Sequence, residues 1–281
     1  MITGDTRVAG VIGDPVRHSL SPVIHNAAFS AGGIDWVYVA FAVPAGRACD
    51  ALAAMRILDI AGLSVTMPHK AGVLAGLDEV SDEASALGAA NTVYRRGSRL
   101  IGDNTDGYGF IRALREEQGL EVEGLRCVVV GAGGAARAVV YGLHRHGAGQ
   151  VIVVNRTPAR ATEAAALGGA VGRVGKHGDI AHADLVVNAT PVGMGVGSGA
   201  EYPFDPQLLG PGQVLVDLVY QPPETPLLAI AAARGARVMN GLSMLLYQAA
   251  RQFELWTGQS APLAAMRSAV RISPPENPQA H

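Results

Sequence analysis

The feature that most limits the fold of this chain is a glycine-rich run near its middle, Gly131-Ala132-Gly133-Gly134-Ala135-Ala136. It follows the apolar run Cys127 to Val130, which is typical of a buried strand, and it opens an alanine-rich stretch that favours a helix to about His146. A G-x-G-x-x-A turn between a strand and a helix lets the backbone approach a pyrophosphate, which the free N–H groups of the helix also attract. The run predicts a dinucleotide-binding unit, with an ordinary glycine-rich turn as the alternative.

The residues after the next apolar run, Val151 to Val154, indicate which dinucleotide is bound. A site for NAD would place Asp or Glu there to hold the ribose hydroxyls, whereas this chain has Asn155-Arg156-Thr157. No acid repels a 2′-phosphate, and Arg156 can set its guanidinium against it together with Arg160, in the first turn of the next predicted helix. We therefore predict NADP. The alternative is that both arginines are solvated surface charges.

The order of apolar runs predicts an α/β fold with two domains. In the N-terminal part, strands are expected at Val8 to Gly13 and Trp36 to Val43, and helices at Pro22 to Ala31 and Ala45 to Met55. Further strands suited to a buried parallel sheet are expected at Asp184 to Asn188 and Val214 to Val219. Beyond Asn240, an apolar face at spacings of three and four predicts a helix through Leu242, Leu245, Leu246, Ala249, Phe253 and Trp256.

Composition excludes several classes of function. The net charge of −2 has no basic runs behind it, so neither nucleic acid nor an anionic membrane surface is an expected partner. No apolar run approaches the ~20 residues of a membrane span, and the start of the chain lacks the features of a signal peptide. The two cysteines, Cys49 and Cys127, are expected to be buried and reduced, and no His or Cys spacing indicates a metal. We expect a soluble, cytoplasmic protein.

Two polar segments of the N-terminal part are candidates for a ligand site. If the segment around Ser19 and Ser21 is extended, both hydroxyls point to one side, where a carboxylate would fit. Ser21 followed by Pro22 also has a structural alternative, as the N-cap of a helix. Lys70 follows the run Ser64-Val65-Thr66-Met67-Pro68-His69, in a chain whose only other lysine is Lys176. Lysine can exchange a proton when its surroundings lower its pKa, whereas arginine cannot, although a solvated loop lysine would fit the segment alone.

Taken together, the segments resemble the shikimate dehydrogenase family from about Gly10 to Trp256. The resemblance rests on GDPVRHSLSP, SVTMPHK, GAANT, GDNTDG, GAGGAAR, NRTPAR, NATPVGM and GLSMLLYQA, in that order. It implies a substrate domain at 1–106 plus 240–281 and an inserted Rossmann-type NADP-binding domain at 107–239. It also implies reversible, NADP-dependent reduction of 3-dehydroshikimate to shikimate. A monomer or a homodimer is expected.

The resemblance assigns roles to individual residues. The substrate carboxylate is held by Ser19 and Ser21, and the ring hydroxyls by Thr66, Asn91, Asp106 and Gln248. Lys70 and Asp106 form the catalytic acid–base pair. The pyrophosphate is held by Gly131, Ala132, Gly133, Gly134 and Ala135, and the adenosine phosphate by Asn155, Arg156, Thr157 and Arg160. Leu218, Tyr220 and Gly241 approach the nicotinamide, and Tyr220 also borders the substrate.

Two positions depart from the family pattern, and three other functions stay open. Ser64 stands where many members carry asparagine, and His69 where phenylalanine is frequent; neither change removes a predicted catalytic group. The first alternative is a quinate/shikimate dehydrogenase of broader specificity. The others are a non-catalytic NADP-binding regulatory protein, since a fold alone does not prove chemistry, and a different small-molecule dehydrogenase.

Overall fold

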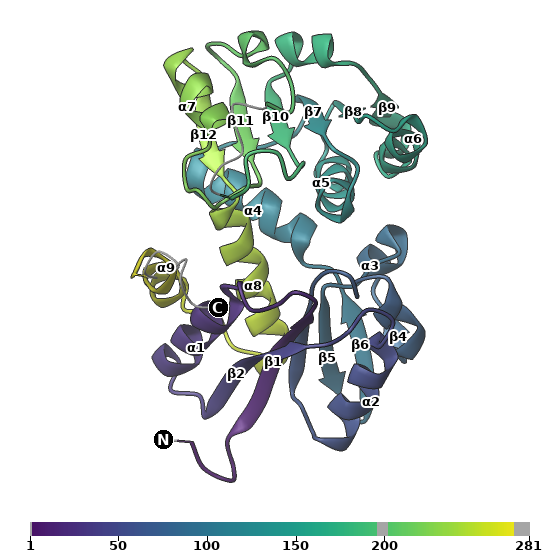
Figure 1. Cartoon of the computed structure of the whole chain (residues 1–281), viewed down its shortest axis with the longest axis vertical. Coiled ribbons are helices and arrows are strands. Elements are labelled where there is room, and N and C mark those ends of the chain that lie inside the picture. The colour runs from purple at the N-terminus through teal and green to yellow at the C-terminus, as the bar shows by residue number, and fades with distance from the viewer. Residues whose placement is uncertain (1, 196–201, 273–281) are drawn as a thin grey trace. The chain divides into compact units, whose positions relative to one another are not determined.

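The computed structural model describes residues 2–195 and 202–272 and divides the chain into two compact units (Figure 1). The first unit is Met1–Thr105 with Ala249–His281, and the second is Asp106–Gln248. The predicted domains divide after residue 106 and before residue 240, so Asp106 and residues 240–248 fall in the second unit instead of with the predicted substrate domain. Residues 273–281 of that predicted domain lie outside the described residues.

The first unit is built on a six-stranded mixed sheet with the order β2-β1-β3-β5-β6-β4. Its strands are β1 (Arg7–Gly13), β2 (Trp36–Ala42), β3 (Gly62–Val65), β4 (Glu79–Val80), β5 (Thr92–Arg96) and β6 (Arg99–Asp103). β1 runs parallel to β2 and β3, whereas β5 runs antiparallel to both β3 and β6. The predicted β-α-β rhythm is thus confirmed for the first strands and is followed by a hairpin.

Helices cover this sheet on both faces. They are α1 (Ser21–Ala31), α2 (Ala48–Ile57), α3 (Asp82–Leu87), α9 (Leu263–Ile272), the 3₁₀ helix η1 (Gly72–Gly76) and the end of α8 (Leu242–Thr257). One apolar core joins β1, β3, β5 and β6 to α2, η1 and α3, and includes Leu52, Met55, Leu63, Val93 and Leu100. On α8, the Trp256 ring lies so close to β3 that a Cβ atom at Gly62 would be 2.5 Å from its Nε1, which donates to the Val93 carbonyl at 3.1 Å.

The second unit contains an entirely parallel sheet with the order β12-β11-β10-β7-β8-β9. Its strands are β7 (Arg126–Val130), β8 (Gln150–Val154), β9 (Gly172–Val174), β10 (Leu185–Asn188), β11 (Val214–Asp217) and β12 (Arg237–Asn240). Read from β9, this is the 3-2-1-4-5-6 order of dinucleotide-binding folds, which confirms the predicted fold class. All residues of β10 and β11 are buried, as expected for strands covered on both faces.

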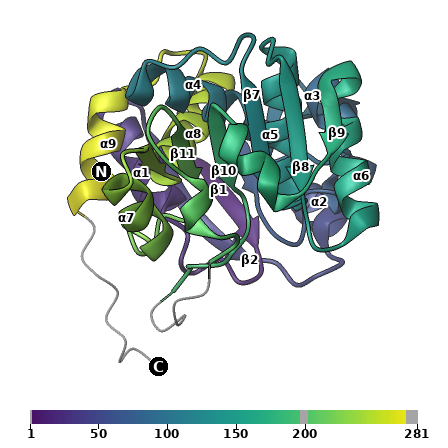
Figure 2. The ribbon, with the colours of Figure 1, turned by 90° about the horizontal axis from the view of Figure 1, so that it is seen from above.

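The helices of the second unit pack on both faces of its sheet. They are α4 (Asp106–Gln118), α5 (Gly134–Arg145), α6 (Pro158–Ala166), α7 (Pro226–Ala233), the start of α8, and the 3₁₀ helices η2 (Gly169–Val171), η3 (His177–His182) and η4 (Pro206–Leu208). α6 lies beside β9 in both views (Figures 1 and 2). An apolar core joins alternate residues of the strands to η3, η4 and α7, and includes Val128, Ile152, Val186, Leu215 and Leu228.

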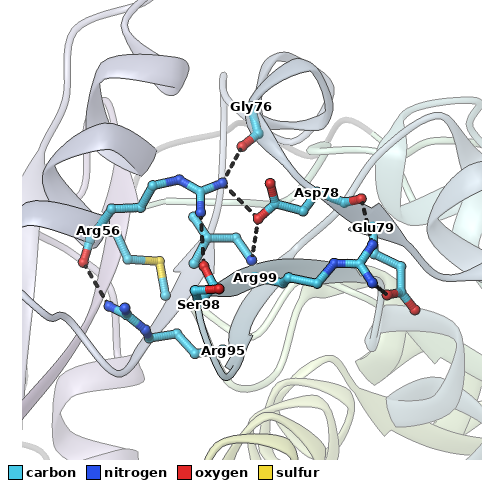
Figure 3. Close-up of polar contacts among 9 residues, drawn as sticks. Arg56, Gly76, Asp78, Glu79, Arg95, Ser98 and Arg99 are labelled. Carbon is cyan, nitrogen blue, oxygen red and sulfur yellow. Dashed lines mark hydrogen bonds and ion pairs between the residues drawn. The ribbon is translucent and has the colours of Figure 1, made fainter.

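An ion-pair cluster holds the β4 margin of the first unit together (Figure 3). Arg56 of α2 pairs with Asp78 at 2.8 Å, and Asp78 accepts from the Leu100 N–H at 2.6 Å. Arg99 pairs with Glu79 at 3.3 Å. The Leu100 N–H and the Arg56 guanidinium lower the pKa of Asp78. The cluster links α2, β4 and the β5–β6 hairpin.

The two cysteines differ in burial. Cys127 is buried as predicted, but Cys49 is exposed, so that prediction was wrong for Cys49; both are free thiols. Cys49 lies on α2 with its sulfur 3.7 Å from the Gly72 carbonyl, at the margin of the core rather than inside it.

No helix at 2–195 or 202–272 is long and apolar enough to cross a membrane. Within the same ranges, no group of three or more His, Cys, Asp or Glu residues is placed to hold a metal ion.

Candidate active site

The glycine-rich turn joins β7 to α5, as the sequence predicts. Gly131 has a positive φ of 117°, and a Cβ atom there would lie 2.8 Å from the Ala189 carbonyl oxygen. Its N–H donates to the Val154 carbonyl at 2.8 Å, which ties the turn to the end of β8. Glycine is therefore required at 131 by the protein's own backbone.

The next two glycines are free of that constraint. A Cβ atom at Gly133 or Gly134 would have no protein atom within 4 Å, so the surrounding described structure does not demand glycine there. Gly133 is the N-cap of α5 and supplies no capping side chain, which leaves the first N–H groups of the helix for another acceptor. Ala136 is fully buried, which agrees with its predicted role in close helix–strand packing. A helix N-terminus with space in front of it fits a pyrophosphate.

The two predicted phosphate-binding arginines lie beyond the end of β8. Arg156 is exposed, and Arg160 lies exposed in the first turn of α6, as predicted. Within the described ranges neither guanidinium forms an ion pair with a carboxylate. The Asn155 side chain donates to the Thr157 carbonyl at 3.1 Å, which closes the turn between them. Nothing acidic opposes a 2′-phosphate at this turn.

A buried carboxylate at the carboxyl edge of the same sheet was missed from the sequence. Asp217 ends β11 with no exposed surface and accepts from Asn188 at 2.9 Å, Thr225 at 2.7 Å and the Val219 N–H at 3.1 Å. Burial raises the pKa of Asp217, and the three hydrogen bonds oppose that rise. Asn188 in turn accepts from Thr190, beside Gly131. An aspartate inside the apolar run VLVDLV was the available signal.

Residues predicted to approach the nicotinamide come together at this edge. Gly241 packs its Cα against the Leu218 carbonyl so closely that a Cβ atom would overlap it. The Gly241 N–H donates to the Val219 carbonyl at 3.2 Å, and α8 starts at the following residue. Tyr220 follows in the same loop and is half-buried. The structure thus joins Leu218 and Gly241 directly.

In the first unit, Ser19 and Ser21 lie close together, though not for the predicted reason. Leu20 between them is helical rather than extended, and Ser19 Oγ accepts from the Ser21 N–H at 3.2 Å. The N-cap prediction for Ser21 was wrong: Leu20 is the N-cap, and Ser21 is the first helical residue. Ser21 is buried in the first turn of α1.

The segment carrying Thr66 and Lys70 follows β3 and closes against β1. Thr66 packs on Gly13, and its N–H donates to the Ile12 carbonyl at 3.0 Å. The neighbouring His69 is buried, with its ring Nε2 2.7 Å from the Val43 carbonyl oxygen. The Lys70 carbonyl accepts from the Ala90 N–H at 2.8 Å. These bonds fix the backbone on both sides of the predicted catalytic lysine.

Among the predicted substrate ligands of this unit, Asn91 forms several hydrogen bonds to neighbouring residues. It is buried, and its side-chain oxygen accepts from Thr92 at 2.8 Å and from the Thr105 N–H at 2.8 Å. Its neighbour Ala90 is bonded to the Lys70 backbone, and Thr105 is followed at once by Asp106. Asp106 is buried and opens α4 of the second unit. The pairing of the Lys70 ammonium with the Asp106 carboxylate stays a prediction.

Gln248, the last predicted substrate ligand, lies on α8 and is also buried. Within the second unit α4 and α8 approach closely, because a Cβ atom at Gly109 would be only 2.7 Å from the Gln248 N–H nitrogen. The Gln248 amide donates to the Leu245 carbonyl at 3.0 Å. Asp106 and Gln248 thus stand on two neighbouring helices.

A second buried polar group in the first unit was not foreseen. The Tyr38 hydroxyl donates to Ser64 Oγ at 2.7 Å, and Ser64 donates to Gln252 Oε1 at 2.6 Å. The Gln252 amide then donates to the Asn91 carbonyl at 3.3 Å. The bonded pair Ser64 and Gln252 is 188 positions apart in the sequence, so no local pattern reveals the group.

Comparison with known proteins agrees with this geometry. Residues 11–93 match the family model described as the shikimate dehydrogenase substrate binding domain. Residues 113–192 match the model for shikimate/quinate 5-dehydrogenase, and residues 241–271 match the shikimate 5′-dehydrogenase C-terminal domain. The three models therefore follow one another along the chain.

Individual relatives match over almost their whole length. A shikimate dehydrogenase (NADP(+)) of Moorella thermoacetica is 46% identical over 280 residues, covering 96% of this chain and 94% of that protein. A solved shikimate dehydrogenase in complex with NADP+ has a TM-score of 0.91 and 38% identity, covering 98% of each chain. The enzyme of Thermus thermophilus, solved with NADP(H) and shikimate, has a TM-score of 0.88 and 39% identity, covering 94% of this chain and 98% of that one. The chain belongs to the shikimate dehydrogenase family.

Proposed function

We propose that this chain reduces 3-dehydroshikimate to shikimate reversibly, with NADP as its cofactor. The observation that carries the proposal is the set of hydrogen bonds around Asn91. The N–H of its neighbour Ala90 donates to the Lys70 carbonyl, and the Asn91 side-chain oxygen accepts from the N–H of Thr105, the residue before Asp106. Family membership and the open glycine turn at Gly133 support the same activity.

The chain's own side chains would bind the ring and handle the proton. NADPH, when bound, supplies the hydride to the ring carbonyl carbon. The Lys70 ammonium donates a proton to the oxygen that becomes the new hydroxyl, and Asp106 orients that ammonium. In the direction of shikimate oxidation, neutral Lys70 takes the proton back. Ser19 and Ser21 hold the carboxylate, while Thr66, Asn91 and Gln248 hold ring hydroxyls.

The glycine turn and the arginines support NADP as the cofactor. Gly131 to Ala135 would cradle the pyrophosphate at the start of α5, and Asn155, Thr157 and the two arginines would hold the 2′-phosphate. Leu218, Tyr220 and Gly241 would border the nicotinamide. Two free thiols agree with a reducing compartment, for which we propose the cytoplasm.

The test is a spectrophotometric assay of cofactor reduction with shikimate and with quinate, each with NADP and with NAD. We expect kcat/KM to be highest for shikimate with NADP. Comparable kcat/KM values for quinate would favour a quinate/shikimate dehydrogenase of broader specificity. The family model that matches residues 113–192 is described for both shikimate and quinate. An absence of turnover with all four pairs would favour a non-catalytic NADP-binding protein.

A further inference from the structure

Asp217, the last residue of β11, has no exposed surface and is bonded to both ends of the loop that follows it. Its Oδ1 accepts from the Val219 N–H at 3.1 Å, near the start of the loop, and its Oδ2 accepts from the Thr225 hydroxyl at 2.7 Å, at the end of the loop. The Asn188 side-chain amide of β10 donates to the same Oδ1 at 2.9 Å. One carboxylate thus closes the loop 218–225 and joins it to the sheet.

An aspartate suits this place because the three groups bonded to it are all donors. An ionised carboxylate only accepts, and its two oxygens can take about four hydrogen bonds. An apolar side chain of the same shape would leave the Asn188 amide, the Val219 N–H and the Thr225 hydroxyl buried without this acceptor. Thr225 is also the N-cap of α7 and accepts from the Leu228 N–H at 3.3 Å, so the end of the loop is fixed to a helix.

The same loop carries the residues expected beside the nicotinamide. The backbone of Val219 is held on both sides, because its N–H donates to Asp217 and its carbonyl accepts from the Gly241 N–H at 3.2 Å. The residues before and after it, Leu218 and Tyr220, are both half-buried. Their positions therefore depend on the two bonds that hold the peptide groups of Val219.

We propose that Asp217 is a positioning residue for the nicotinamide, whose carboxylate holds the loop 218–225 in the conformation that aligns the ring for hydride transfer. This inference rests on the proposed function, because it assumes that Leu218 and Tyr220 border the nicotinamide. A misplacement of about 1 Å is enough to slow a reaction about 100-fold. The adenosine end of the cofactor is assigned to the residues after β8, which β10 and β7 separate from β11, so its binding should not depend on Asp217.

The other end of β11 offers a matched control. Gln213 directly precedes the strand, is buried, and also uses its side chain for three hydrogen bonds. It donates to the carbonyls of Ile180 and Ala183 at 2.7 and 2.8 Å and accepts from the Gly210 N–H at 2.8 Å. Gln213→Leu should therefore lower the Tm much as Asp217→Leu does, but at the amino edge of the sheet.

The experiment compares the unaltered chain with Asp217→Leu and Gln213→Leu. It measures kcat/KM for NADP at saturating shikimate, and by calorimetry the Kd of NADP and of adenosine 2′,5′-bisphosphate, which carries the adenosine end of NADP without the nicotinamide. We expect Asp217→Leu to lower kcat/KM for NADP by roughly 10- to 100-fold and to raise the Kd of NADP by roughly 3- to 10-fold. The Kd of the bisphosphate should be unchanged. Gln213→Leu should change none of the three quantities.

Two milder variants test the same bonds one at a time. Asp217→Asn keeps an oxygen for Asn188 and Val219 and can donate to the Thr225 oxygen, so it should restore most of the kcat/KM lost in Asp217→Leu. Thr225→Val keeps the shape of threonine and removes only the bond at the end of the loop. It should lower kcat/KM for NADP by roughly 3- to 10-fold, and it keeps the inference testable if Asp217→Leu does not fold.

Four results would overturn the proposal. They are an unchanged kcat/KM for NADP in Asp217→Leu or Thr225→Val, an equal weakening of NADP and the bisphosphate in Asp217→Leu, the same loss of kcat/KM in Gln213→Leu, or a loss in Asp217→Asn as large as in Asp217→Leu. If the unaltered chain binds NADP but turns over neither shikimate nor quinate, the proposed function fails, and the inference is judged from the Kd values of the same variants. If the unaltered chain binds no NADP, both fail.

Discussion

The two units prepare their predicted ligand sites in different ways. In the second unit the glycine turn offers bare backbone: Gly133 and Gly134 face open space, and Arg156 and Arg160 are exposed. In the first unit the predicted ligands Ser21 and Asn91 are buried, and Asn91 is already hydrogen-bonded to the side chains of Thr92 and Thr105. A site made of backbone groups depends on residues close together in the sequence, whereas a site made of side chains depends on residues far apart in the sequence. We therefore expect ligand binding at the glycine turn to tolerate substitutions of neighbouring side chains that would abolish binding in the first unit.

The largest effect is expected in the side-chain site. Lys70→Ala removes the proposed proton donor and should lower kcat by roughly 100- to 10,000-fold while leaving shikimate affinity largely intact. Steady-state kinetics and shikimate calorimetry measure the two quantities. Lys176→Ala, which removes the other lysine at an exposed position, serves as the control. Near-normal turnover in Lys70→Ala would remove the lysine from the mechanism.

The exposed arginines should give a large effect of a different kind. Replacing both Arg156 and Arg160 by Ala removes the charged hydrogen bonds to the 2′-phosphate and should raise the KM for NADP by roughly 10- to 100-fold. The KM for NAD should change little, because NAD lacks that phosphate, and thermal unfolding should be unaltered at these exposed positions. Equal losses for both cofactors would contradict the assignment.

Gly131 and Gly133 of the same turn should differ in effect, because substitution of Gly131 should lower stability and substitution of Gly133 should weaken NADP binding. Gly131→Ala puts a side chain at a φ of 117° and 2.8 Å from the Ala189 carbonyl, and should lower the free energy of unfolding by about 1–3 kcal/mol or more. Gly133→Ala meets no protein atom within 4 Å, so its Tm should hold while its KM for NADP rises. Urea unfolding and cofactor titration of both variants measure this contrast. A stable Gly131→Ala, or a Gly133→Ala that binds NADP normally, would break it.

A smaller effect concerns stability rather than binding. Burial lowers the pKa of His25 from 6.5 to about 3, and among the described residues neither nitrogen of its ring has a hydrogen-bond partner that would offset the cost of burying the charge. Between pH 6.5 and about pH 3, His25 is protonated in the unfolded chain but stays neutral in the folded chain. The free energy of unfolding therefore falls as the pH drops from 6.5 towards 3. The contribution of His25 is about 1.4 kcal/mol per pH unit. It is absent above pH 6.5.

Replacing the histidine tests this dependence. Urea unfolding at pH 7.5, 6 and 5 should show a weaker loss of stability for His25→Phe, which fits the aromatic cluster of Tyr38 and Trp256, than for the unaltered chain. His182→Gln, at an exposed position, should keep the original dependence. Parallel curves for His25→Phe and the unaltered chain would mean that His25 titrates normally.

What the sequence predicted correctly was local in origin. The turn at Gly131, the first turn of α6 at Arg160 and the strands β7, β8, β10 and β11 follow from spacing and apolar runs over a few residues, whereas the edge strands β9 and β12 were not predicted. The β5–β6 hairpin was not predicted, since polar residues around Gly97 hide its short strands. The N-cap role of Ser21 was predicted wrongly, because the helix begins one residue earlier than expected, with Leu20 in a helical conformation as its N-cap.

The side-chain site was predictable only in part. Ser19 and Ser21 were paired from the period-two spacing of an extended segment, whereas Leu20 between them is helical. Lys70 was singled out for its proton chemistry, and the roles of Thr66 and Asn91 came from the family resemblance alone. The chain from Tyr38 through Ser64 to Gln252 joins three elements that only the folded sheet brings together. Asp217 was hidden in an apolar run, where its carboxylate is stabilised by Asn188 from an earlier strand and Thr225 from a later loop.

A crystal structure of the protein with shikimate and NADP would test whether Lys70 and Asp106 form the acid–base pair. We expect the Lys70 ammonium and the Asp106 carboxylate to contact the same ring hydroxyl, at the carbon that faces the nicotinamide. A complex in which either side chain is turned away from that hydroxyl would contradict it.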